Sequence, residues 1–186
     1  MSGQGKSMEE NVRASFAATA QKRGSAVGIL QGARADVLRE IGARGVGAAI
    51  WQRALPEGFA EGIAALPAAR LPELRETVGV AVARLPAGPL RDHLIGDVTA
   101  LGQLFAEISG ARRLHLRLQP ITTNACSRFH IDNLRLRMLC TYRGAGTEFA
   151  LGAPGSDPEA PIADAPTGAV VLMRGTLWPG AEAPGV

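Results

Sequence analysis

Aromatic side chains are scarce in this chain, with Phe, Trp and Tyr making up 4% of its 186 residues. Proteins that bind single-stranded nucleic acid stack bases on aromatic rings, and few rings are present here. The net charge is also small, +3 from 20 basic and 17 acidic residues, so the large basic excess of a nucleic-acid-binding domain is missing. We therefore expect no nucleic acid partner.

Long apolar runs are missing as well. Arg, Gly or Pro interrupts every apolar stretch well short of the roughly 20 residues that a membrane-spanning helix needs. The N-terminal stretch 1–25 contains no continuous apolar core of the kind that a secretory signal requires. We therefore expect a cytoplasmic protein that does not cross a membrane. Its two cysteines, Cys126 and Cys140, are then expected to be free thiols, with a disulfide across a hairpin as the alternative.

Glycine and proline are plentiful, with 23 and 12 residues, and they punctuate the chain. Residues 1–25 are polar, small and turn-prone, which predicts a mobile tail. Residues 26–186 are long enough for a single domain with its own core. Near residue 110 the hydrophobic period changes from 3.6 to 2. We therefore predict an α+β fold in which a helical part, 26–110, packs on an antiparallel sheet formed by 111–186.

Residues 89–110 carry the clearest helical pattern, because apolar side chains recur there at steps of three and four. These are Leu90, Leu94, Val98, Leu101, Phe105 and Ile108. Pro89 is suited to begin such a helix and Gly110 to end it. Short helices are predicted between residues 57 and 80. The apolar run at 46–51 is typical of a buried strand.

Three later stretches are typical of strands. Residues 113–119 alternate leucine with polar side chains, which places His115 opposite the core. Residues 168–174, "GAVVLMR", predict another strand, which is closed by Gly175. In residues 128–140 the even positions share one face, namely His130, Asp132, Leu134, Leu136, Met138 and Cys140. Arg135 and Arg137 then face solvent, although this stretch is long for a single strand and Asn133 could mark a bulge or turn.

His130 and Asp132 are the candidate ligands of a metal ion. On the apolar face of a strand, an imidazole and a carboxylate would be costly to bury without a partner. One cation could satisfy both, either iron(II) in a two-histidine, one-carboxylate set or zinc. A hydrogen-bonded structural pair is the alternative that this spacing leaves open.

The stretches "AIWQR", "CSRFHIDNLRLRMLCTYRGAGTEF" and "GAVVLMRGTLWPG" together resemble the bacterial family called domain of unknown function 1826, over roughly residues 46–186. The resemblance implies a cupin-like double-stranded β-helix, or jelly roll, with His130 and Asp132 as metal ligands. It also implies a place in zinc or iron homeostasis, with a zinc-chaperone GTPase as the expected partner.

One departure from the family concerns the third ligand. The family has a histidine after its Trp-Pro-Gly element, whereas no histidine follows His130 in this sequence. We expect the chain to be truncated at its C-terminus, with an incomplete barrel that binds a divalent metal weakly. Cys126, which shares the parity of His130, is the alternative third ligand.

Three functions follow as hypotheses. The first is a metal-binding protein of zinc or iron homeostasis. The second is an iron(II), 2-oxoglutarate-type oxygenase, for which Arg174 is the candidate to bind the co-substrate carboxylate. The third is a non-metal interaction domain in which the His130–Asp132 pair fastens a strand end. Whether the protein is an enzyme is left open.

Overall fold

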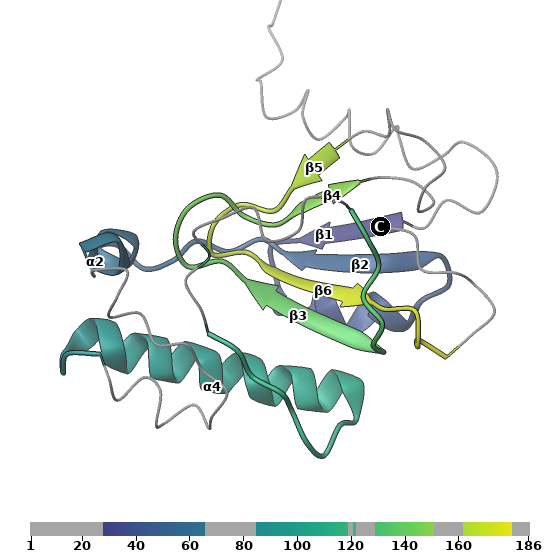
Figure 1. The fold of residues 1–186 in the computed structure, drawn as a ribbon, viewed down its shortest axis with the longest axis horizontal. Coiled ribbons are helices and arrows are strands. Elements are labelled where there is room, and N and C mark those ends of the chain that lie inside the picture. The colour runs from purple at the N-terminus through teal and green to yellow at the C-terminus, as the bar shows by residue number, and fades with distance from the viewer. Residues whose placement is uncertain (1–27, 66–84, 119–120, 122–128, 151–161, 180–186) are drawn as a thin grey trace, which may run out of the picture.

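The computed structural model describes residues 28–65, 85–118, 121, 129–150 and 162–179 (Figure 1). Its helices are η1, a 3-10 helix (Ala35–Gly42), α2 (Phe59–Ala65) and α4 (Pro89–Ser109). Its strands are β1 (Gly28–Gly32), β2 (Val46–Trp51), β3 (Leu136–Cys140), β4 (Glu148–Ala150), β5 (Ile162–Asp164) and β6 (Val170–Arg174). The fold is therefore mixed α/β, with helices and an open, mainly antiparallel sheet. The predicted tail at 1–25 lies outside the described residues.

The main sheet has the strand order β1-β2-β6-β3. Strand β6 pairs antiparallel with both β2 and β3, while β1 and β2 are parallel. A parallel pair needs a crossover of about a dozen residues, and residues 33–45, which include η1, provide it. The described strands after residue 110 pair antiparallel, as predicted, but the prediction that residues 111–186 form the sheet by themselves was wrong. Half of the main sheet, β1 and β2, lies well before that point in the chain, and one of the pairings is parallel.

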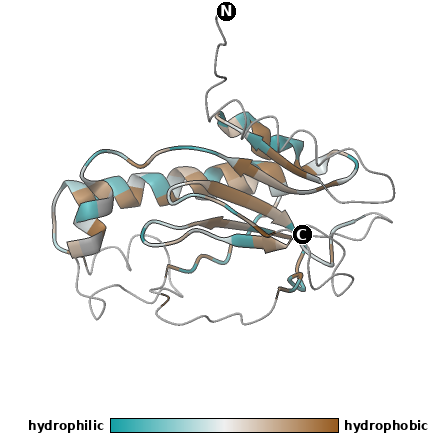
Figure 2. Ribbon diagram, turned by 90° about the horizontal axis from the view of Figure 1, so that it is seen from above, coloured by the Kyte–Doolittle hydropathy of each residue, from teal (hydrophilic) through white to brown (hydrophobic). Residues whose placement is uncertain are grey.

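The two faces of this sheet are covered by different elements. On one face, η1 and the second half of α4 pack on a core that includes Leu38, Leu101 and Leu172. On the other face, the hairpin β4–β5 contributes Phe149, which packs with Ile50 and Val171. The strands between the two layers are largely hydrophobic, as Figure 2 shows, whereas α4 carries both hydrophilic and hydrophobic residues.

Helix α4 begins and ends where the sequence predicts. Pro89 occupies its first turn, and Gly110 adopts the left-handed conformation at φ 66°, donating its N–H to the Ala106 carbonyl. A left-handed residue at this position is usually glycine, because a Cβ is disfavoured there. The buried residues Leu94 and Val98 belong to the predicted apolar stripe. They pack with α2 in a second, smaller core.

The alternation in residues 113–119 does not produce a strand. None of the described residues in this stretch pairs with another strand, and Leu114 is 41% exposed. Leu116 and Leu118 instead pack against the smaller core beside α2 and α4. An extended segment can bury alternate leucines against helices without any backbone partner, so period 2 alone did not distinguish the two arrangements.

Strand β3 is shorter than the predicted strand at 128–140, but its parity is as predicted. Leu136, Met138 and Cys140 face the core beneath η1 and α4, and Leu139 packs on the opposite side. The chain bends at residues 133–135, just before β3. Residues before this bend therefore do not continue the alternation, as the alternative reading of Asn133 anticipated.

Candidate functional site

The segment that leads into β3 brings His130 and Asp132 together. The Nε2 atom of His130 lies 3.5 Å from Oδ1 of Asp132, and the two side chains are 53% and 20% exposed. The prediction that this pair lies on the interior face of a strand was wrong. The chain bends at residues 133–135 and leaves the core face there, so that His130 is exposed and Asp132 is partly buried.

Arg137 contacts the second oxygen of Asp132. Its Nε lies 2.9 Å from Oδ2, and its side chain is 42% exposed. This agrees with the prediction that Arg137 faces solvent, although the ion pair itself was not foreseen. Asp132 thus has one oxygen toward His130 and the other toward Arg137. Two oxygens with different partners give the carboxylate a defined orientation.

The turn that follows β6 holds the backbone around Asp132. The Asp132 carbonyl accepts the N–H groups of both Leu134 and Thr176, each at 2.9 Å. Gly175 donates its N–H to the Arg135 carbonyl, and Leu177 donates to the Leu134 carbonyl. The segment that precedes β3 and the turn that follows β6 are therefore bound to each other by backbone hydrogen bonds.

Arg174, the residue before this turn, is buried and bound to backbone. Its Nε donates to the carbonyl of Ile41 at 2.8 Å, and its Nη2 donates to the carbonyl of Ala43 at 2.7 Å. Its guanidinium also lies over the ring of Trp178, 4.8 Å from the centroid. Arg174 therefore binds carbonyl groups at the C-terminal end of η1, where a helix leaves carbonyls without intrahelical partners, and the Ala43 carbonyl also accepts the N–H of Val46.

The other histidines and cysteines do not join the pair. His115 is exposed on the segment after α4, and the His93 ring packs against Phe59 with 4.8 Å between centroids. Cys140 is a free thiol, and Cys126 lies outside the described residues. Within the described part of the chain, no three histidine, cysteine, aspartate or glutamate side chains come together as a metal site.

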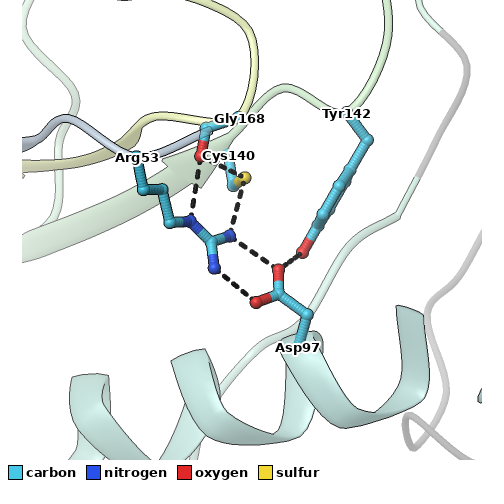
Figure 3. Close-up of polar contacts among 5 residues, drawn as sticks. All are labelled: Arg53, Asp97, Cys140, Tyr142 and Gly168. Atoms are coloured by element: carbon cyan, nitrogen blue, oxygen red, sulfur yellow. Dashed lines mark hydrogen bonds and ion pairs between the residues drawn. The ribbon is translucent and has the colours of Figure 1, made fainter. Parts of the chain in front are cut away.

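A second polar cluster, which sequence reasoning missed, connects α4 to the sheet (Figure 3). Arg53 forms a two-pronged ion pair with Asp97, with its Nη2 2.6 Å from Oδ2. Tyr142 donates its hydroxyl to the same oxygen at 2.6 Å. Arg53 also donates from Nε to the Gly168 carbonyl, while its Nη2 lies 3.5 Å from Cys140 Sγ. Arg53 and Asp97 are 44 positions apart in the sequence, and Asp97 and Tyr142 are 45 apart. No local spacing therefore indicates that these side chains meet.

Burial governs the electrostatics of this second cluster. Desolvation opposes ionisation of Asp97, but hydrogen bonds from Arg53 and Tyr142 outweigh it and lower the pKa of this carboxyl below its usual value. Desolvation raises the pKa of the Cys140 thiol and, together with the nearby negative groups, the pKa of Tyr142. A protonated thiol is a poor nucleophile, and the carboxylate is already paired. The cluster thus has the character of a structural tie rather than a reactive site.

Comparison with known proteins gives one match. The model of a protein family of unknown function, DUF1826, matches residues 32–186. No curated protein and no solved structure matches the chain. In the part of the chain that the structure describes, no helix is both long and apolar enough to cross a bilayer.

Proposed function

Because the chain belongs to the DUF1826 family, whose description names no activity, we propose its function from the geometry of the surface pair: His130 and Asp132 bind a divalent metal ion, zinc or iron(II). The observation that carries this proposal is the 3.5 Å separation of Nε2 and Oδ1. Two ligand atoms bound to one tetrahedral zinc, at about 2.0–2.1 Å each, lie about 3.4 Å apart. The pair is already spaced for one cation.

Arg137 has two opposite effects on a metal ion at this pair, because it orients the carboxylate and also repels a cation. Carboxylates that bind metals are commonly oriented by a further hydrogen bond to their second oxygen. Arg137 holds Oδ2 of Asp132 at 2.9 Å, which leaves Oδ1 on the side of His130. The same charge also lowers the affinity for a bare cation, since two positive groups would share one carboxylate.

Two protein ligands make a weak site, so a third donor is part of the proposal. Cys126 is the candidate in this sequence, four positions before His130, and its thiolate would favour zinc. Metal and protons compete for the imidazole and the thiol. Affinity is therefore expected to fall as the solution is acidified.

The finer expectations from the family resemblance remain part of the same proposal. They are a cupin-like arrangement of the β-strands, a role in bacterial zinc or iron homeostasis in the cytoplasm, and a zinc-chaperone GTPase as partner. A surface metal site suits transfer to or from a partner better than a buried one, because the ion is accessible.

The oxygenase alternative gains no support from the contacts of Arg174. To bind a co-substrate carboxylate, its guanidinium would have to leave the two carbonyls that it satisfies at the end of η1. The interaction-domain alternative requires only that the His130–Asp132 pair is structural. Metal titration distinguishes it from the first proposal.

Zinc titration of the full chain against a chromophoric chelator tests the proposal. We expect one zinc ion per chain, and His130→Ala and Asp132→Ala should each weaken binding at least tenfold. His115→Ala is the matched control, because it removes another exposed imidazole, and should leave affinity unchanged. Cys126→Ser tests the third donor. Equal zinc affinity in the parent and His130→Ala proteins would overturn the proposal.

A further inference from the structure

The loop that carries Asp132 is hydrogen-bonded to a turn that is distant in sequence. Three consecutive residues of this turn, Gly175–Leu177, donate their N–H groups to carbonyls of the loop 132–135, at 2.9 to 3.1 Å. Thr176 adds a side-chain hydrogen bond to Asn133 at 3.0 Å. The loop thereby acquires a fixed path. The backbone that carries Asp132 cannot move without breaking several of these bonds.

Gly175 makes this close approach possible. A Cβ added at Gly175 would lie 2.6 Å from the Asp132 carbonyl oxygen and would overlap the Leu134 carbonyl oxygen even more closely. Real Cβ atoms do not approach oxygen so closely, and both obstacles are backbone rather than flexible side chains. Any larger residue at this position must therefore push the loop away from the turn.

The turn is also fastened to the buried framework, through Arg174 and Trp178. Arg174 is 8% exposed and bound to the carbonyls of Ile41 and Ala43, and Trp178 stacks on its guanidinium. Trp178 also packs against the main core. The turn is thus held on two sides, by the end of η1 on one and by the loop 132–135 on the other.

We propose that the turn Gly175–Trp178, fastened by Arg174, positions the His130–Asp132 pair and is coupled to the metal that the pair binds. This rests on the proposed metal-binding function and assigns Arg174 and Gly175 a positioning role in it. Coupling is reciprocal, because a ligand that favours the ordered loop must also stabilise the turn that orders it. Metal binding should therefore protect the amides of the turn, and loosening the turn should weaken metal binding.

The test compares Gly175→Ala with Gly96→Ala in the full chain. The control adds the same methyl group where nothing lies within 4 Å. Gly175→Ala should weaken zinc affinity at least tenfold, and Gly96→Ala should leave it unchanged. Trp178→Leu and Arg174→Lys loosen the turn less severely, and each should weaken zinc binding several-fold. In the parent, zinc should slow amide hydrogen exchange at Thr176 and Leu177.

The outcomes separate this inference from the proposed function. If zinc binds the parent through His130, and folded Trp178→Leu and Arg174→Lys proteins bind it as tightly as the parent, the positioning role is refuted. If the parent binds no zinc, the proposed function fails, and the positioning role is judged by nuclear magnetic resonance alone. Unchanged His130 ring signals in Trp178→Leu and Arg174→Lys would then refute it, whereas shifted signals would support it. Should Gly175→Ala fail to fold, these two variants decide the question.

Discussion

Asp97 and Asp132 are both held by an arginine and by a second polar side chain, but they lie in different surroundings. Asp97 is 9% exposed and joins Arg53 and Tyr142 between α4 and the sheet. Asp132 is 20% exposed, and its partners Arg137 and His130 are about half exposed. A buried charge depends on its partners for stability, whereas a partly hydrated one can exchange them. The ion pair of Asp97 therefore stabilises the fold, whereas Asp132 is able to exchange a partner for a ligand.

The largest expected effect follows from removing the buried carboxylate. Asp97→Ala leaves the Arg53 guanidinium, whose side chain is only 17% exposed, without its ion-pair partner. Loss of one member of a buried pair costs about 3–5 kcal/mol of unfolding free energy. Urea unfolding followed by circular dichroism measures this. A loss below about 1 kcal/mol, the range of exposed ion pairs, would show that water or another group replaces Asp97 and would remove the contrast with Asp132.

A smaller loss is expected from Tyr142→Phe. This change deletes the hydroxyl that donates to Asp97 at 2.6 Å, while the ring that contacts Phe59 is kept. A hydrogen bond to a charged group contributes about 1.5–3 kcal/mol, so the unfolding free energy should fall by an amount in this range. The double variant Asp97→Ala, Tyr142→Phe should cost less than the sum of the two single losses, since both remove the same contact. Additive losses would contradict the hydrogen bond.

Acid should weaken the buried cluster by less than either substitution, because protonation keeps the side chain in place. The pKa of Asp97 is lower in the folded protein than its usual value of about 3.9, so the unfolded chain binds more protons in this range. The stabilisation is complete above that value and is lost as the pH falls through the folded pKa. Unfolding free energies measured from pH 6 to pH 2 should fall less steeply below about pH 4 in Asp97→Asn than in the parent. Equal slopes would argue against the lowered pKa.

The sequence predicts those parts of the fold that local patterns determine. Helix α4 was predicted with its ends, because Pro89 and Gly110 act on their own turns. The sequence also predicted which side chains of β3 face the core, because the apolar residues Leu136, Met138 and Cys140 occupy every second position. These features depend on neighbours within a few positions, where propensity and periodicity are informative.

The remaining features depend on contacts between distant residues. Nothing near β1 indicates that it pairs parallel with β2, because strand pairing is decided by the crossover and the packing of η1. Asp97 and Tyr142 are 45 positions apart, so their hydrogen bond has no signature in spacing. His130 and Asp132 were found as a pair from their spacing. Their surface position was not found, since it depends on the bend before β3 and on the turn after β6.

The smallest effect on stability is expected for the substitution of Asp132. It tests the comparison between Asp97 and Asp132 most directly. Asp132→Ala should lower the unfolding free energy by less than about 1 kcal/mol, because its partners Arg137 and His130 are about half exposed and ion pairs with hydrated partners contribute little. Asp36→Ala is the matched control, since Asp36 also pairs with a neighbouring arginine, Arg34, at 3.1 Å on the surface. Urea unfolding should not distinguish the two variants. Zinc titration should distinguish them, because only Asp132→Ala removes a proposed ligand.

The contradicting outcome is that Asp132→Ala destabilises the protein by more than about 2 kcal/mol, beyond the range of exposed ion pairs, and leaves zinc binding unchanged. The pair is then a structural fastening, and the two aspartates perform the same task.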